Sequence, residues 1–249
     1  MIADIYLDLL KRSLLNTIYG EHEPGYDESA RLRGLDLPAW ASTMVGRARL
    51  DNVERCVREV VQYGVPGDLI EAGAWRGGVA ILMRGCLAVD GDESRRVWVA
   101  DSFRGVPPSC RHPEDLTYRE PRLAVSVGEV RRNFERYNLL DEKIKFVEGW
   151  FSDTLPKLPP EVRFSVVRLD CDTYESTKTA LAPLYPKLSP GGFLIVDDYY
   201  ALPGCREAVL EYRSWRGLEE PFMPIEEPDG YLAIYWRKRS SCVSVGASR

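Results

Sequence analysis

Short apolar runs alternate with helical patterns from residue 68 onward. The strand-like runs are DLIEAG (68–73), RVWVAD (96–101), KIKFVEG (143–149), FSVVRLD (164–170) and GGFLIVDD (191–198). Helical patterns lie near 47–63, 78–89, 126–138, 174–187 and 203–215. The strand runs are almost continuously apolar, which is typical of parallel strands buried on both faces. We therefore predict an α/β fold with a parallel sheet covered by helices on both faces.

The two ends of the chain depart from this alternation. MPIEEPDGYLAIYWRK places Asp229-Gly230 before an alternating aromatic run, which predicts a closing antiparallel hairpin. At the other end, charged residues interrupt DIYLDLLKRSLLNTIYG, so it is interpreted as an amphipathic helix and not a signal peptide. We expect a helical cap over 1–45, a core domain over 46–239 and a disordered tail over 240–249.

One long polar segment interrupts the core domain. Residues 102–125 are rich in proline, and a connection of this length in a compact domain favours a functional lid or mobile loop over a surface insertion.

Composition narrows the class of protein. The 249 residues are 45% hydrophobic and 29% charged, with a net charge of −5, which argues against a nucleic-acid partner. No apolar run is long enough to span a membrane, so we expect a cytoplasmic protein without a membrane partner. The six cysteines are scattered without metal-type spacing, which predicts reduced thiols. With only His22 and His112 present, acid–base chemistry must depend on carboxylate, lysine or tyrosine.

Five acidic residues and one glycine lie at the ends of four predicted strands. They are Glu71, Gly73, Asp101, Asp170, Asp197 and Asp198. Each alone could be a helix cap or a solvated turn. The carboxyl ends of parallel strands share one sheet edge, where open α/β sheets bind their ligands. The four ends together therefore predict a binding site.

The turn EAGAWRGG after the first strand indicates the kind of cofactor. Its glycines would let a ligand approach the backbone, but the spacing does not match the dinucleotide fingerprint. Glu71 would repel a phosphate and suits an ammonium group. Asp101 occupies the place of an acid that binds ribose hydroxyls. A nucleoside that carries an amino acid fits both, which favours S-adenosylmethionine.

The remaining acids indicate a metal. Asp170, Asp197 and Asp198 would lie side by side at the ends of neighbouring strands, and their repulsion requires a cation. Oxygen ligands favour Mg²⁺, which can lower the pKa of a substrate hydroxyl. For Asp172 we prefer the role of N-cap of the helix at 174–187 over that of a ligand.

Five segments resemble the macrocin-type sugar O-methyltransferases. They are LDNVERCVREVVQYGVPGDLIEAGAWRGG, VWVADSFRGVPP, EGWFSDTLP, RLDCDTYEST and LSPGGFLIVDDYY, within a resemblance that spans about residues 3 to 238. The resemblance implies a class I methyltransferase fold with a mostly parallel seven-stranded sheet. It also implies S-adenosylmethionine and Mg²⁺ as cofactors, a homodimer, and methylation of a sugar hydroxyl on a glycosylated secondary metabolite. The cap and the loop after DSF would help to cover the substrate.

The resemblance also implies roles for individual residues. Asp170 would be both a metal ligand and the general base, beside the ligands Asp197 and Asp198. The implied cofactor contacts are Glu71 and Gly73 with Thr43 and Met44 for the methionine part, Asp101 and Ser102 for the ribose, and Trp150, Ser152 and Asp153 for the adenine. The chain has Cys171 where relatives often have glycine, and we expect little consequence.

Two alternatives stay open at this point. A catechol-type O-methyltransferase would use similar ligands. A catalytically inactive binding partner could also share the fold, although all three metal-position aspartates are present.

Overall fold

The computed structural model describes residues 2–107, 121–228 and 230–239. The predicted tail over 240–249 and the middle of the predicted lid over 102–125 lie outside the described residues.

Seven strands form one mixed sheet within the described residues. The order β3-β2-β1-β4-β5-β7-β6 places β1 and β4 at the centre. The strands are β1 (Asp68–Ala72), β2 (Val97–Asp101), β3 (Ile144–Glu148), β4 (Phe164–Leu169), β5 (Leu188–Val196), β6 (Met223–Glu227) and β7 (Gly230–Arg237). The first five are parallel, whereas β7 runs antiparallel to both β5 and β6. The predicted parallel sheet and closing hairpin are thus confirmed.

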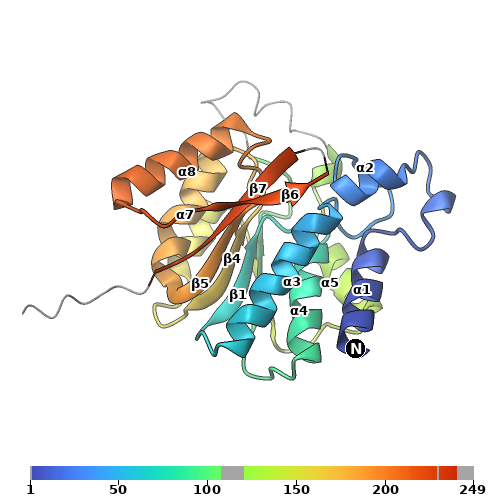
Figure 1. Ribbon diagram of the computed structural model, residues 1–249, viewed down its shortest axis with the longest axis horizontal. Coiled ribbons are helices and arrows are strands. Elements are labelled where there is room, and N and C mark those ends of the chain that lie inside the picture. The colour runs from blue at the N-terminus through green and yellow to red at the C-terminus, as the bar shows by residue number, and fades with distance from the viewer. Residues whose placement is uncertain (1, 108–120, 229, 240–249) are drawn as a thin grey trace, which may run out of the picture.

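Helices cover both faces of the sheet (Figure 1). One group is α1 (Ile2–Leu14), α3 (Arg47–Gln62), α4 (Gly78–Val89) and α5 (Val127–Arg136). The other is α6 (Phe151–Thr154), α7 (Tyr174–Lys187) and α8 (Pro203–Arg216), and the short helix α2 (Glu28–Arg33) belongs to the N-terminal cap. Short 3₁₀ turns span Gly20–His22, Pro121–Leu123 and Leu155–Lys157.

Two hydrophobic cores explain why the strand sequences lack alternation. Leu69 packs into the core beneath α3 and α4, while its neighbour Ile70 packs into the core beneath α7 and α8. Both side chains are fully buried. Successive side chains of a strand point to opposite faces, and here both faces are covered, so both positions must be apolar.

The N-terminal helix is shorter than predicted. α1 ends at Leu14, because Asn16 adopts a left-handed backbone conformation with φ 54° and the Thr17 N–H donates to the Arg12 carbonyl. The side chain of Asn16 then donates to Glu23 (2.8 Å), which joins the helix end to the rest of the cap. None of the helices in the described parts of the chain combines the length and apolarity that a bilayer crossing needs.

Candidate active site

A cavity opens beyond the carboxyl ends of β1, β2 and β4. Nine residues predicted from the sequence line it, namely Thr43, Met44, Glu71, Gly73, Asp101, Ser102, Trp150, Ser152 and Asp170. Four of them, Glu71, Gly73, Asp101 and Asp170, come from the predicted strand ends, which lie together because parallel strands deliver their last residues to one edge.

The turn between β1 and α4 requires glycine at its first position. Gly73 has φ +92°, and a Cβ there would lie 1.7 Å from the carbonyl oxygen of Asp170. The ends of β1 and β4 therefore approach more closely than any side chain would allow. Gly77 precedes α4 in a left-handed conformation (φ +82°), and a Cβ there would meet Val130 of α5 at 2.6 Å.

Glu71 is fully buried and supports the helix that follows the turn. One carboxylate oxygen accepts a hydrogen bond from Arg168 (2.7 Å), and the other accepts from the backbone N–H of Ala80 in the first turn of α4 (3.0 Å). Burial raises the pKa of Glu71 to about 8, against the opposing charge of Arg168. The carboxylate lines the cavity, so it can also meet a ligand ammonium group there.

Asp101 holds the same turn from the neighbouring strand. Its carboxylate accepts hydrogen bonds from the backbone N–H groups of Ala74 (2.7 Å), Trp75 (3.2 Å) and Phe103 (2.8 Å). Burial raises its pKa, although these three hydrogen bonds favour the ionised form. The next residue, Ser102, donates to the carbonyl of Gly105 (2.8 Å) and so shapes the start of the loop after β2.

The N-terminal cap supplies another wall of the cavity. The carbonyl of Ser42 accepts from the N–H of Gly78 (3.1 Å), and Arg76 donates to the carbonyl of Ala41 (2.8 Å). These contacts dock the loop before α3 onto the start of α4. They place Thr43 and Met44 against the cavity.

Two of the three residues predicted to contact the adenine lie at the cavity. Trp150 and Ser152 line the cavity, and Phe151 between them does so as well. Asp153 is exposed and is not among the lining residues. Its place in the short helix α6 turns it outward, which the motif EGWFSD could not show.

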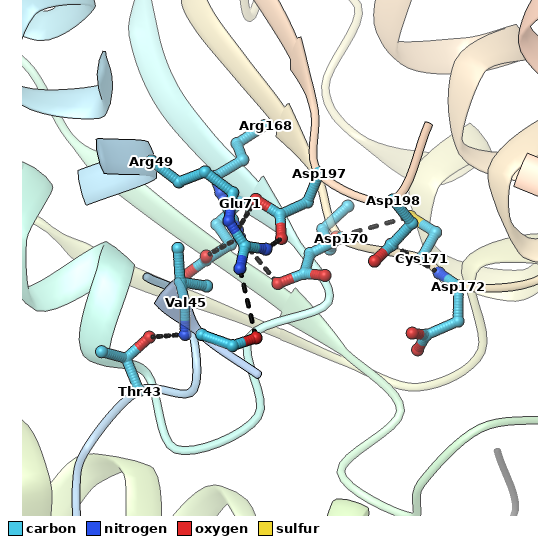
Figure 2. Close-up of polar contacts among 12 residues, drawn as sticks. Thr43, Val45, Arg49, Glu71, Arg168, Asp170, Cys171, Asp172, Asp197 and Asp198 are labelled. Carbon is cyan, nitrogen blue, oxygen red and sulfur yellow. Dashed lines mark hydrogen bonds and ion pairs between the residues drawn. The ribbon is translucent and has the colours of Figure 1, made fainter. Parts of the chain in front are cut away.

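A group of three carboxylates lies beside the cavity. Within the described residues, Asp170, Asp172 and Asp198 each offer an oxygen, and these oxygens lie within 4.8 Å of one another. Asp172 has a left-handed backbone (φ 57°), and its N–H donates to Asp198 (3.1 Å) (Figure 2). This turn after β4 therefore brings Asp172 to the acids at the end of β5.

Asp197 is held by two arginines, Arg49 and Arg168 (Figure 2). One of its oxygens accepts from Arg168 (2.5 Å), the other from Arg49. Burial alone would raise the pKa of Asp197, but the two guanidinium groups outweigh it and lower the pKa. The acidic group thus differs from the predicted ligand set at one member, because it contains Asp172 in place of Asp197.

Asp198 differs sharply from its neighbour in sequence. In the described parts of the chain no ion pair with lysine, arginine or histidine engages its carboxylate. Burial, followed by the charges of Asp170, Asp172 and Asp197, raises its pKa well above the usual range. The closeness of these carboxylates makes their simultaneous ionisation unfavourable unless a cation lies beside them.

The predicted helix cap at Asp172 is wrong. Thr173 is the N-cap of α7, and its hydroxyl oxygen accepts from the N–H of Ser176 (3.2 Å). Threonine is also a favoured N-cap residue, and the left-handed conformation at Asp172 leaves the position directly before the helix to Thr173.

Removal of the Thr173 hydroxyl should lower stability. Thr173→Ala is expected to lower the free energy of unfolding by about 1 kcal/mol, because the Ser176 N–H loses its partner. Thr173→Ser keeps the hydroxyl and should retain most of that energy, and Asp172→Asn should leave the cap intact. Urea denaturation of the three variants measures this, and a larger loss in Asp172→Asn than in Thr173→Ala would contradict the assignment.

Two buried arginines were missed by reasoning from sequence. Arg168 is fully buried in β4 and donates to Glu71, Asp170 and Asp197. Its position inside the apolar run FSVVRLD was a usable signal, because a buried charge requires partners of opposite sign. Arg49 gave no such signal, since it belongs to a helix rich in charged residues.

The fold and the cavity together define a class of enzyme. A sheet of this strand order, in which only β7 runs antiparallel to the other strands and a ligand cavity lies over β1, β2 and β4, is the architecture of class I S-adenosylmethionine-dependent methyltransferases. The solved structure of the O-methyltransferase NovP superposes with a TM-score of 0.89 at 44% identity, covering 96% of this chain and all of that one. The calicheamicin methyltransferase CalS11 shares the fold, with a TM-score of 0.66 at 21% identity over 92% of this chain and 91% of that one.

Sequence comparison specifies the family. The model of the macrocin-O-methyltransferase family matches residues 3–238, and the chain belongs to this family of O-methyltransferases. Among curated relatives, 8-demethyl-8-(2,3-dimethoxy-alpha-L-rhamnosyl)-tetracenomycin-C 4'-O-methyltransferase of Streptomyces olivaceus is 49% identical, covering 94% of this chain and 92% of that protein. Mycinamicin III 3''-O-methyltransferase of Micromonospora griseorubida is 44% identical, covering 95% of this chain and 97% of that protein.

Proposed function

We propose that the protein transfers a methyl group from S-adenosylmethionine to a sugar hydroxyl of a glycosylated secondary metabolite. The observation that carries this proposal is the cofactor cavity, which adjoins the acidic group through Asp170 and Asp172, since both residues belong to the cavity lining and to the acidic group. The relatives support the choice of acceptor, because the Streptomyces olivaceus enzyme is named for a rhamnosyl substrate.

Asp170 is the general base of this proposal. It lines the cavity, and Arg168 donates to one of its oxygens (2.9 Å), which holds the carboxylate in place. Burial raises its pKa, a change that makes a carboxylate a stronger base. The acceptor oxygen attacks the methyl carbon, the carbon–sulfur bond breaks in line with the attack, and the hydroxyl proton passes to Asp170.

The acidic group fits a hard divalent cation such as Mg²⁺. It offers carboxylate oxygens from Asp170, Asp172 and Asp198, and none of the ion pairs formed by the described residues neutralises Asp198. Asp197, also predicted as a ligand, would join these three only by leaving one of its two arginines. When bound, the cation would lower the pKa of the acceptor hydroxyl.

Two exposed aromatic rings, one of them close to the acidic group along the chain, are candidates for contact with the acceptor. Tyr200 follows Asp198 by two residues and is 39% exposed, and its ring centroid lies 5.9 Å from that of Tyr231, which is 48% exposed. A backbone hydrogen bond from Tyr200 to the carbonyl of Leu232 (2.8 Å) holds the pair together. Such rings suit the apolar faces of sugars and of ring-bearing aglycones.

A panel of acceptors tests the proposal. Purified protein is incubated with S-adenosylmethionine and either deoxysugar glycosides or catechols, and products are identified by mass spectrometry. We expect methylation of a glycoside and none of the catechols. Turnover of catechols alone would favour the catechol-type alternative. Cofactor binding without turnover of any acceptor, across a broad glycoside panel, would favour an inactive binding partner.

Removal of divalent cations should abolish turnover. We expect EDTA to reduce methyl transfer by about 100-fold or more and added Mg²⁺ to restore it. The reason is that the proposed metal activates an acceptor hydroxyl that is only weakly acidic. Asp198→Asn should weaken the response to Mg²⁺, while Asp153→Asn, which changes an exposed acid outside the cavity, should behave as wild type. Full activity in EDTA would remove the metal from the proposal.

The homodimer and the cytoplasmic location stay predictions.

A further inference from the structure

Arg49 touches three segments that are far apart in the sequence. It lies in the first turn of α3, with a side chain only 7% exposed. Its guanidinium donates to Asp197 after β5 and to Glu227 of β6 (2.8 Å). It also approaches the carbonyl oxygens of Arg33 (3.3 Å) and Gly34 (3.4 Å), at the end of α2.

Those two carbonyls belong to the neck of a closed loop. Gly34 ends α2 in a left-handed conformation (φ 65°), and Gly46 precedes α3. A Cβ on Gly34 would lie 2.4 Å from the Gly46 nitrogen and 2.4 Å from the Nη2 atom of Arg49. A Cβ on Gly46 would lie 2.6 Å from the carbonyl carbon of Arg33. The ends of loop 34–46 therefore touch, and the Arg49 side chain lies against their junction.

Loop 34–46 forms part of the cofactor cavity. Thr43, Met44 and Val45 line it, and the Thr43 hydroxyl accepts from the Val45 N–H (3.1 Å). The middle of the loop is held apart from the neck, because the N–H groups of Ala39 and Trp40 donate to Glu23 and the N–H of Ser42 donates to the Leu14 carbonyl (2.8 Å). Thr43, Met44 and Val45 follow these anchors and directly precede Gly46, so their position depends on how the loop closes at its neck.

On its other side Arg49 joins the ion pairs of the acidic site (Figure 2). Asp197 is shared between Arg49 and Arg168, and Arg168 also holds Glu71 and Asp170. One connected set of charges thus runs from the loop neck through Arg49, Asp197 and Arg168 to the acid proposed as the base.

We propose that Arg49 is a positioning residue. It fixes the position of the cofactor-lining loop 34–46 relative to the acidic group at the ends of β4 and β5. The planar guanidinium satisfies two carboxylates and two carbonyls at once, which lysine cannot do. Loss of this link releases the loop neck and Asp197 together, so cofactor binding and turnover both decline. The inference rests on the proposed function, since it requires the cofactor in this cavity.

Arg47 provides a matched control in the same helix turn. It pairs with Asp8 (2.7 Å) and Asp51 (3.0 Å) on the surface, and its side chain is 30% exposed. Neither partner lines the cavity. Replacement of Arg47 removes an arginine and two ion pairs from α3 but leaves the loop neck untouched.

The test compares Arg49→Met and Arg49→Lys with Arg47→Met and Arg47→Lys, at a temperature where circular dichroism shows each variant folded. Calorimetry measures binding of S-adenosylhomocysteine, and hydrogen exchange with mass spectrometry measures the amides of loop 34–46. We expect the Arg49 variants to bind about tenfold more weakly and to lose exchange protection in the loop. We expect kcat/KM to fall on the order of 100-fold. The Arg47 variants should stay within about twofold of wild type, as expected for surface ion pairs.

Each outcome separates the inference from the proposed function. If wild type fails to bind S-adenosylhomocysteine, the proposed function fails, and loop exchange alone then decides whether Arg49 holds the neck. If wild type binds and the Arg49 variants match the Arg47 variants in affinity and loop exchange, the inference is overturned while the function stands. Should Arg49→Met not fold, Arg49→Lys carries the same comparison against Arg47→Lys.

Discussion

Asp170→Asn is expected to reduce kcat by about 100- to 10,000-fold, the range that loss of a general base commonly costs. Asparagine has nearly the same shape and keeps an oxygen that can accept from Arg168, so the fold of the site should persist. It cannot take up the hydroxyl proton. Affinity for S-adenosylhomocysteine should therefore remain within a few-fold of wild type, as calorimetry would show.

Asp172→Asn, measured beside it, makes the experiment decisive. Asp172 belongs to the same acidic group and also lines the cavity. Near-normal turnover in Asp170→Asn combined with a large loss in Asp172→Asn would transfer the role of base to Asp172. Asp153→Asn supplies the control, because Asp153 is exposed and lies outside the cavity.

Arg168→Met is expected to lower the free energy of unfolding by about 3–5 kcal/mol, the usual cost when one partner of a buried ion pair is removed. Arg168 is fully buried and its guanidinium is shared among Glu71, Asp170 and Asp197. Methionine fills a similar volume, but it deprives Glu71 and Asp170 of their arginine partner and leaves Asp197 paired with Arg49. Urea denaturation measures the loss. Arg163→Met, an exposed position just before β4, should cost about 0.5 kcal/mol or less.

The stability lost in Arg168→Met should depend on pH in a definite direction. In wild type the pKa of Asp197 is lowered, so its contribution to stability is present above the unfolded pKa of about 4 and fades as the pH falls below that value. Without Arg168 the buried carboxylates hold their protons more tightly than in the unfolded chain. The difference in free energy of unfolding between wild type and Arg168→Met should consequently be larger at pH 7 than at pH 5. A difference that grew toward acid would contradict the assigned ion pairs.

The limits of most helices and strands could be predicted closely, because the local sequence shows which strands are buried on both faces. Each of the five parallel strands was placed within about three residues of its observed limits, and α4 and α7 were placed at their observed limits. Among the strands, the largest error was at β5, which begins at Leu188 and not at Gly191. Ser189, Pro190 and Gly191 look like a turn, but the backbone N–H of Gly191 pairs with Lys238, a partner beyond the end of β7.

The candidate site could be predicted in its position and in nine of the residues that line it. Strand-end acids at Glu71, Asp101 and Asp170 reach one edge whatever their side-chain partners are, because parallel pairing alone brings them there. The roles of Asp172 and Asp197 were not accessible in this way. They depend on one left-handed residue after β4 and on an arginine 148 residues before Asp197.

The α/β alternation, the edge of the sheet that carries the site and the residue types available there follow from the sequence alone, because apolar periodicity and strand ends are local properties of the chain. Which charges neutralise one another depends instead on how the elements pack in three dimensions. Arg49 and Arg168 meet Asp197 through packing of α3 against β4 and β5, and the same packing leaves Asp198 with Asp170 and Asp172. Pairing of buried charges depends on distances of a few ångströms between elements, and no pattern along the chain encodes those distances directly.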